Sequence, residues 1–173
     1  MANFENNWRR QQEIKMRPYV DKIYNNIFNS NVGIKRFESI DEFILDKKFA
    51  IDVQLTLSNG QILLGQEKFL SNKYARYRTI TVEYKQNPIT DEDGDWFKLA
   101  PQIYFVGYIN ATNDGFDPWV LMNWTNLVLN SNNNNITWSF NNNKYDGARA
   151  SFTYTIMDDL PSECIIDCSW NKR

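Results

Sequence analysis

Two segments of alternating apolar and polar residues meet at Asn59-Gly60, and they constrain the fold more than any other feature of the sequence. In the first segment the apolar positions are Ile51, Val53, Leu55 and Leu57. The second segment, residues 61–70, returns after the turn. Alternation with a period of two predicts β-strands, and an Asn-Gly pair between two strands predicts a tight turn. The sequence therefore predicts a β-hairpin over residues 51–70.

The regions on both sides of this hairpin predict further helices and strands. Apolar residues recur at helical spacing up to Phe28, and Pro18 predicts two helices that join near Arg17. Residues 39–45 could form a short helix. Strands are predicted at residues 78–84, 103–109, 119–129 and 148–156, with a loop at residues 90–95. Residues 130–143 predict another loop, which a short strand at residues 136–140 interrupts. Residues 119–129 could also be a strand followed by a helix.

The length of 173 residues suits one buried core and is too short for two ordinary domains. We therefore expect one domain over residues 1–173, of α/β (α+β) class, with a mixed β-sheet whose central hairpin is flanked by helices. The N-terminus has charges and amides where a secretory signal needs an apolar core, and no run of about eighteen apolar residues occurs. These features predict an intracellular, cytoplasmic protein.

Histidine is absent from the sequence, which excludes several classes of mechanism. Ser-His-Asp and Cys-His hydrolases, histidine-based nucleases and histidine-ligated zinc enzymes all need an imidazole. The two cysteines, Cys164 and Cys168, cannot complete a tetrahedral zinc site without histidine, so reduced and packed thiols are expected. Any catalysis must therefore use carboxylates, amides, lysine and a hard metal ion.

The charges are distributed unevenly along the chain. Residues 1–86 contain fourteen Lys and Arg against ten Asp and Glu, a net charge of +4, whereas residues 87–173 contain five against eleven, a net charge of −6. A bound polyanion such as DNA would therefore lie against the N-terminal half. The acidic C-terminal half could be a surface for a protein partner or an ordinary solvated exterior, and a homodimer is also compatible with the sequence.

The hairpin carries a set of residues that suits metal-dependent hydrolysis of phosphodiesters. Asp52 lies near the start of the first strand, and Gln66-Glu67-Lys68 lies on the returning strand. The Asp52 carboxylate, the Gln66 side-chain oxygen and the Glu67 backbone carbonyl could bind Mg²⁺, or Mn²⁺ in its place, with water completing the octahedron. The metal would lower the pKa of a bound water, and Lys68 would orient that water or stabilise the charge of the transition state.

The segment DKKFAIDVQLTLSNGQILLGQEKFL, residues 46–70, resembles the core hairpin of the PD-(D/E)xK nuclease superfamily. That superfamily includes restriction endonucleases, phage exonucleases and junction resolvases. The resemblance covers residues 46–84 and implies a restriction-endonuclease-like fold with catalytic residues at Asp52, Gln66 and Lys68. Gln66 stands where the superfamily usually has an acid, although QxK forms also occur within it. This departure removes one negative charge and bears on metal affinity rather than on the fold.

The register of the hairpin tests whether the three residues can meet. A two-residue turn would pair Ser58 with Gln61, and Asp52 would then lie on the face opposite Gln66 and Lys68. One additional residue pairs Ser58 with Ile62, so that Asp52 faces Lys68 and Gln54 faces Gln66. We therefore predict a three-residue loop or a bulge, with a positive φ at Gly60.

Further residues around the hairpin could complete the site. Glu83, on the predicted third strand, could be another metal ligand, and the superfamily often supplies an acid from a preceding helix, where Glu13 or Glu38 would serve. Asp46 is a competing acid, but its place before two lysines favours the turn that enters the strand. The cations expected to hold phosphates, without reading the base sequence, are Lys47, Lys48, Lys73, Arg76, Arg78 and Arg149.

Two hypotheses follow from these residues. The first is a Mg²⁺-dependent deoxyribonuclease of a bacterium, phage or mobile element, which cleaves DNA at Asp52, Gln66 and Lys68. The second keeps the nuclease fold without catalysis, as a DNA-binding or protein-inhibiting module, because Gln66 replaces an acid and the chain is acidic overall.

Overall fold

The computed structural model describes residues 2–29, 31–37, 48–87, 92–98, 100–142 and 150–170. Six strands form the larger sheet, in the order β1-β2-β3-β6-β7-β10. Their bounds are β1 Gly33–Arg36, β2 Val53–Thr56, β3 Ile62–Leu70, β6 Ile103–Ile109, β7 Phe116–Asn123 and β10 Ile165–Cys168. The β3–β6 pair is parallel and the other pairs are antiparallel, so the sheet is mixed.

A second, antiparallel sheet contains four strands in the order β5-β4-β9-β8. These strands are β4 Thr79–Asn87, β5 Glu92–Asp93, β8 Ser139–Asn142 and β9 Ser151–Ile156. The two sheets are connected by a 3-10 helix, η1 Asn72–Tyr77, which follows β3 directly and leads into β4. Two further 3-10 turns precede β10, η3 Met157–Asp159 and η4 Ser162–Cys164, and η2 Asp95–Phe97 precedes β6.

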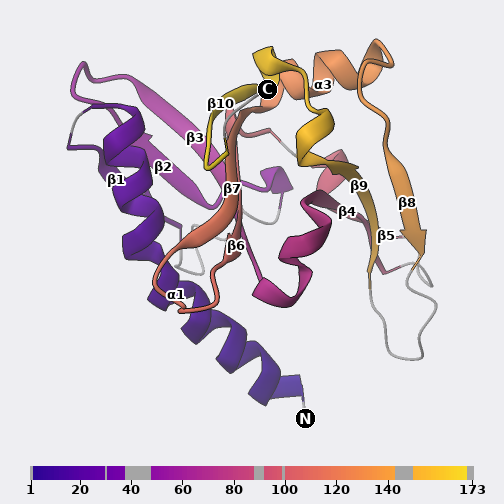
Figure 1. The fold of residues 1–173 in the computed structure, drawn as a ribbon, viewed down its shortest axis with the longest axis horizontal. Coiled ribbons are helices and arrows are strands. Elements are labelled where there is room, and N and C mark those ends of the chain that lie inside the picture. Colours follow the sequence, from indigo (N-terminus) through magenta and orange to yellow (C-terminus); the bar gives the residue numbers. More distant parts are fainter. Residues whose placement is uncertain are drawn as a thin grey trace.

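The larger sheet is covered on its two faces by different kinds of structure. The helix α1 Ala2–Ile27 packs on one face, where Met16, Val20 and Tyr24 join a cluster with Val53 and Phe105. The second sheet packs on the other face and builds a cluster of its own, which includes Ile80, Val82, Tyr104, Val106, Met122 and Met157. Figure 1 shows this arrangement, with α1 and the strands of the second sheet on opposite sides of β6 and β7.

Alternation along β3 sends its side chains to these two clusters in turn. Leu63 and Phe69 pack in the cluster beside α1, whereas Leu70 packs in the cluster between the sheets. Because strand side chains alternate between faces, Glu67 shares the α1 face, and Gln66 and Lys68 share the face toward the second sheet. This division decides which residues of the triplet can meet.

The structure confirms an α+β fold with a mixed sheet, and it corrects part of the predicted architecture. Helices do not flank both faces of the hairpin, because the second sheet covers the face opposite α1. The predicted break at Pro18 is also wrong, since α1 is continuous through it. Pro18 lies on the exposed side of α1, where water can replace the missing backbone hydrogen bond while the buried side stays continuous.

Other elements follow the predictions with shifted boundaries. The predicted strand at residues 103–109 is β6, and residues 119–129 are the strand-then-helix alternative, β7 followed by α3 Trp124–Asn132. The side chain of Asn123 caps α3 by accepting a hydrogen bond from the Asn126 N–H at 3.0 Å. β1, β10 and the short β5 were not expected, and the possible helix at residues 39–45 lies outside the described residues. No helix within the described parts of the chain is both long and apolar enough to cross a membrane.

Candidate functional site

The β2–β3 hairpin closes through a three-residue loop, Ser58-Asn59-Gly60. Leu57 donates to the Gln61 carbonyl at 2.8 Å, and β2 pairs with β3 from Val53–Gly65 to Thr56–Ile62. The Asn59 side chain closes the loop by accepting from the Gln61 N–H at 2.9 Å, and Gly60 has a φ of 83°. The predicted odd-length loop and the positive φ at Gly60 are therefore confirmed.

The predicted pairs are wrong by two residues, because the loop begins one residue earlier and ends one residue earlier than expected. Gln54 pairs with Leu64 rather than with Gln66. The regular pairing ends at Val53–Gly65, and Asp52 is not opposite Lys68, because its own N–H donates to the Gly65 carbonyl in an irregularity at the start of β2. A shift of two residues keeps Gln66 and Lys68 on the side of β3 that faces the second sheet, and Asp52 lies close enough for its charge to act on Tyr104 of the same cluster.

Asp52 lies just before β2 and joins the hairpin through both its backbone and its side chain. Its N–H donates to the Gly65 carbonyl at 2.9 Å. Its carboxylate Oδ2 accepts from the backbone N–H of Glu67 at 3.0 Å. The carboxylate thus takes the place of a backbone acceptor where β2 has not yet begun, and these two bonds hold Asp52 beside the Gln66-Glu67-Lys68 triplet.

Lys68 extends from β3 into the space between the two sheets. Its Nζ donates to the backbone carbonyl of Thr81 on β4 at 2.8 Å and lies 5.3 Å from the centre of the Phe152 ring on β9. Burial lowers the pKa of the Lys68 ammonium, while the negative charges of Asp95 and Glu83 oppose that shift. The Lys68 amino group is therefore buried between the two sheets.

Gln66 presents an unpartnered oxygen on the same side. Its Oε1 is buried and has no hydrogen-bond partner among the described residues. A buried carbonyl oxygen without a partner costs about 1–3 kcal/mol relative to a satisfied one. This oxygen is therefore a site where a cation or a water molecule would be stabilised.

Tyr104 on β6 completes the electrostatic surroundings. Its hydroxyl donates to the Thr81 carbonyl at 3.2 Å, so it shares an acceptor with Lys68. Burial raises the pKa of Tyr104 well above its ordinary value, and the negative charges of Asp95 and Asp52 add to that shift. We use the name intersheet site for Asp52, Gln66, Lys68 and Tyr104, with Glu83 and Asp95 close enough to act on their charges. Sequence reasoning missed Tyr104 and Asp95, which come from β6 and η2.

The donor atoms of this site suit a magnesium ion that keeps several of its waters. No group of three or more His, Cys, Asp or Glu side chains gathers to hold a metal within the described residues. Mg²⁺ commonly binds through one or two carboxylates together with water and substrate phosphates. Asp52 and the buried Gln66 oxygen fit that smaller set, and the Glu67 backbone carbonyl stays a predicted ligand.

The Glu67 side chain belongs to the opposite face, where it forms a buried ion cluster that the sequence analysis missed. Arg36 of β1 donates from Nε to Glu67 Oε2 and from Nη2 to Glu67 Oε1, both at 3.0 Å. The same guanidinium donates to Asp21 of α1 at 2.6 Å, and the Tyr24 hydroxyl donates to Glu67 at 3.1 Å. The cluster therefore ties α1, β1 and β3 together directly behind the triplet.

Burial and pairing act in opposite directions on this cluster. The side chains of Arg36 and Glu67 are 13% and 6% exposed. Burial raises the pKa of Glu67, while the hydrogen bonds and positive charge of Arg36 oppose the shift. Arg36 stays charged because both carboxylates bind it. A signal was present in the sequence, since Glu67 falls on the same alternating face as Leu63 and Phe69, where an acid needs a partner.

The other predicted acids separate into three cases. Glu83 lies on β4, near enough to influence Lys68. Glu13 is exposed on α1, where its carboxylate accepts from Arg17 at 3.1 Å, so it is on the far side of the sheet from the intersheet site. Glu38 and Asp46 lie outside the described residues.

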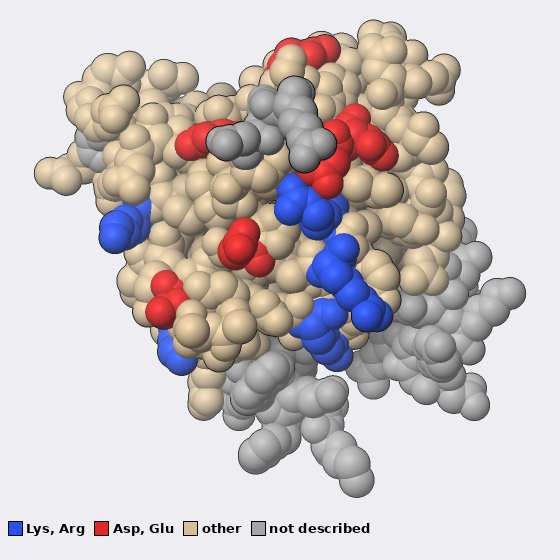
Figure 2. Space-filling view, viewed as in Figure 1, with Lys and Arg blue, Asp and Glu red and all other residues tan. Residues whose placement is uncertain are grey.

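The predicted phosphate-binding cations lie mainly on η1. Lys73 and Arg76 are exposed on this helix, and Lys48 is exposed before β2. Arg78 follows η1 and makes a bidentate pair with Asp158, with both N–O distances at 2.8 Å. Lys47 and Arg149 lie outside the described residues. Figure 2 shows Lys and Arg side chains in a column over the part of the molecule where Figure 1 draws the segment between β3 and β4.

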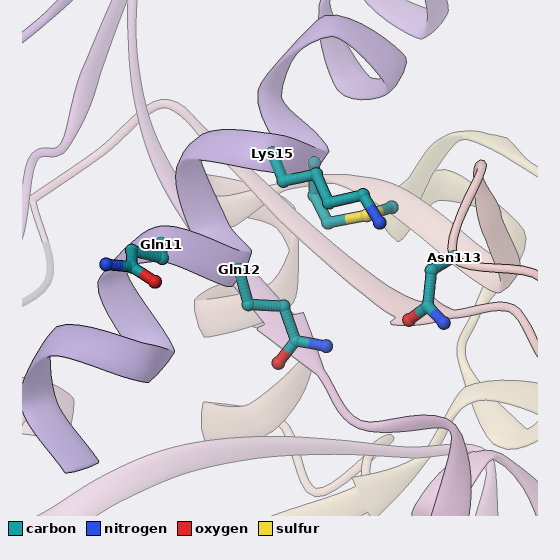
Figure 3. Close-up of a pocket in the computed structure, with 5 residues that line it drawn as sticks. Gln11, Gln12, Lys15 and Asn113 are labelled. Atoms are coloured by element: carbon teal, nitrogen blue, oxygen red, sulfur yellow. The ribbon is translucent and has the colours of Figure 1, made fainter. Parts of the chain in front are cut away.

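A separate cavity of about 350 Å³ lies on the α1 side of the molecule. Its lining residues are Gln11, Gln12, Lys15 and Met16 of α1, with Asn113 from the turn between β6 and β7 (Figure 3). None of them belongs to the intersheet site, because α1 covers the opposite face of the larger sheet. The cavity therefore takes no part in the chemistry of Asp52, Gln66 and Lys68.

Taken together, these elements define an α+β protein in which a six-stranded mixed sheet is packed between a long helix and a four-stranded sheet. The intersheet site lies between β3 and the second sheet. Comparison of the chain with family models, with curated proteins and with solved structures gave no match.

Proposed function

We propose that this protein is a Mg²⁺-dependent nuclease that hydrolyses DNA phosphodiester bonds at Asp52, Gln66 and Lys68. The observation that supports the proposal most is the hydrogen bond from the Glu67 N–H to the Asp52 carboxylate, which lies beside the buried unpartnered Gln66 oxygen and the Lys68 amino group on β3. The resemblance of residues 46–84 to the PD-(D/E)xK hairpin supports it, as does the absence of histidine for other mechanisms.

Each residue has a distinct part in this mechanism. Asp52, which is partly exposed, and Gln66 would hold Mg²⁺ through oxygen, and the ion would supply an acidic water and polarise a phosphoryl oxygen. Lys68 is covered by the second sheet. Its positive charge would stabilise the negative charge that develops on the phosphoryl group. Glu67 positions Asp52 through its backbone N–H.

The test is cleavage of linear, circular and single-stranded DNA by the purified protein, with and without Mg²⁺. Lys68→Met keeps the bulk of the buried side chain and removes its charge, and Asp52→Asn keeps an oxygen acceptor for the Glu67 N–H. Both variants should fold and lose cleavage by about a hundredfold or more. Glu13→Gln, a change in an exposed acid on the far side of the sheet, is the matched control and should cleave normally.

Cleavage by Lys68→Met at the wild-type rate would reject the catalytic assignment. A nuclease active equally with and without divalent cations would reject the metal assignment.

A second candidate function is a nuclease-like module that binds DNA or inhibits a protein without cleavage. Two observations favour it: Gln66 replaces the usual acid, and no cluster of three acidic, histidine or cysteine side chains gathers among the described residues. Calorimetry with Mg²⁺ or Mn²⁺ separates the two candidates, because a binding-only module need take up no cation at the triplet. Heat of binding that disappears in Asp52→Asn supports the nuclease.

A further inference from the structure

The 3-10 helix η1 carries an unusually open surface of rings and cations. None of its six residues is buried. Tyr74 and Tyr77 are 48% and 52% exposed, although aromatic side chains of this size are usually buried in large part. Lys73 and Arg76 are exposed beside them. We use the name η1 surface for these four residues.

The geometry of a 3-10 helix arranges the η1 surface in two rows. Such a helix has three residues per turn, so residues i and i+3 lie in line, about 6 Å apart along the axis. Lys73 and Arg76 therefore form one row, and Tyr74 and Tyr77 form the other. The rows are in contact, because Lys73 Nζ lies 4.5 Å from the Tyr74 ring centre and Arg76 Cζ lies 4.7 Å from that of Tyr77. Each turn of η1 thus presents one ring with one cation beside it.

The two cations of this surface keep their charge available for an anion. Within the described residues neither Lys73 nor Arg76 forms an ion pair with a carboxylate. Arg78 differs, since its guanidinium is bound by Asp158 and lies 4.7 Å from the centre of the Trp170 ring. The η1 surface therefore has an uncompensated positive charge, whereas the residue that follows it is already paired.

We propose that the η1 surface binds a single strand of DNA, with bases stacked on Tyr74 and Tyr77 and phosphates held by Lys73 and Arg76. Phosphates alone would need only the two cations, and bases within a duplex have no free faces to stack on a ring. An unpaired strand uses both rows at once. The repeat of about 6 Å lets neighbouring nucleotides meet successive turns of the helix.

The position of η1 in the chain connects this surface to the proposed catalytic chemistry. β3 carries Gln66 and Lys68 and ends at Leu70, and η1 begins two residues later at Asn72. A strand bound along η1 is thus held next to the end of β3. This inference rests on the proposed nuclease function, whose substrate it specifies as a single-stranded or locally unpaired region of DNA.

The test is fluorescence anisotropy in EDTA, so that binding is measured apart from cleavage. The probes are a labelled 20-nucleotide oligothymidine, of a length that spans the site sizes of about 4–16 nucleotides known for strand-binding folds, and a duplex of matching length. Wild-type protein should bind the single strand at least about tenfold more tightly than the duplex. Changing both Tyr74 and Tyr77 to Ala should weaken single-strand binding by about tenfold or more, and changing both to Phe should retain it.

The cation row has a separate readout in the salt dependence. The double change Lys73→Gln with Arg76→Gln should reduce the slope of log K against log salt by about 1.4, since each phosphate contact to a single strand contributes about 0.7. Phe140→Ala, which removes a ring that is 61% exposed on β8, is the matched control and should leave single-strand binding unchanged.

Equal or tighter binding of the duplex would overturn the proposal, as would an unchanged affinity when both tyrosines become Ala. Failure of the nuclease proposal would look different. In that case the wild-type protein would bind the oligothymidine through η1 and yet cleave no DNA in Mg²⁺.

Discussion

The backbone N–H of Glu67 donates a 3.0 Å hydrogen bond to the carboxylate of Asp52, fifteen residues earlier in the chain. Asp52 therefore has two possible parts in the intersheet site. Its oxygen satisfies a backbone donor of β3, and its negative charge acts on neighbouring groups such as Tyr104. Substitutions that separate the oxygen from the charge can measure the two parts independently.

Asp52→Ala and Asp52→Asn should differ in stability and agree in cation binding. Alanine leaves the Glu67 N–H without its acceptor, which should lower the free energy of unfolding by about 1–3 kcal/mol. Asparagine retains an oxygen acceptor and should cost less than about 1 kcal/mol. Both should lose Mn²⁺ binding, because neither has the negative charge. Urea unfolding and calorimetry check the two effects, and equal stability of the two variants would contradict the structural part.

Substitutions at Gln66 should change stability differently with and without a divalent cation. Gln66→Met removes the buried unpartnered oxygen, so without cation its free energy of unfolding should lie within about 1 kcal/mol of wild type. Wild-type protein should be stabilised by about 2.7 kcal/mol at a Mg²⁺ concentration about one hundred times the dissociation constant, and Gln66→Met should lose this gain.

Gln66→Glu provides the matched comparison. Its second carboxylate beside Asp52 should destabilise the protein without cation and tighten Mg²⁺ binding by about tenfold. Thermal unfolding at several Mg²⁺ concentrations measures both variants. If the cation stabilised Gln66→Met as much as wild-type protein, the Gln66 oxygen would not be a ligand of the ion.

The sequence predicted the parts of the site that depend on local pattern. Period-two alternation and Asn59-Gly60 specify the hairpin, and the alternation along β3 puts Gln66 and Lys68 on one face. The error of two residues in the pairing arose because the register depends on where the loop begins, and the Asn59 side chain favours the earlier position.

The surroundings of Lys68 could not be predicted in the same way. Its acceptor is the backbone carbonyl of Thr81. Every residue has such a carbonyl, so the amino-acid sequence does not indicate which one Lys68 binds. The second sheet was also hidden, because β9 buries Ser151, Thr153 and Thr155, polar residues that a pattern assigns to the surface. Arg36 and Glu67 are thirty-one residues apart, so only the fold brings them together.

Lys68→Met should raise stability at neutral pH and change its dependence on alkaline pH. Because burial lowers the pKa of Lys68 in the folded protein, the unfolded chain binds more protons, and wild-type stability rises with pH. The rise begins near the folded pKa and ends near the unfolded value of 10.5. Met has no such contribution, so the variant should be more stable by about 1 kcal/mol or more at neutral pH and should lack the rise.

Urea unfolding between neutral pH and pH 10.5 measures the difference. The Thr81 carbonyl keeps the Tyr104 hydroxyl as a donor in the variant, so no acceptor is left unpaired. Parallel pH profiles of the two proteins would show that the ammonium is solvated rather than buried.

Arg36→Met should be among the most destabilising single changes, with a cost that depends on acidic pH. Removal of the guanidinium leaves the buried Glu67 carboxylate without its main partner, which should cost about 3–5 kcal/mol at neutral pH. Loss of Arg36 also removes the effect that opposes burial, so the pKa of Glu67 should rise further above its unfolded value of 4.5.

A folded pKa above the unfolded one means that the folded protein holds the extra proton, so the penalty applies fully above the folded value. It should shrink as the pH falls toward 4.5, where Glu67 is neutral in the folded variant. Asp158→Asn, which breaks the exposed pair with Arg78, is the control and should cost less than about 1 kcal/mol at any pH. Equal stability of the two variants at neutral pH would show that the cluster of Arg36, Glu67 and Asp21 does not hold α1, β1 and β3 together. The backbone hydrogen bonds of the sheet alone would then keep Glu67, and through it Asp52, in position.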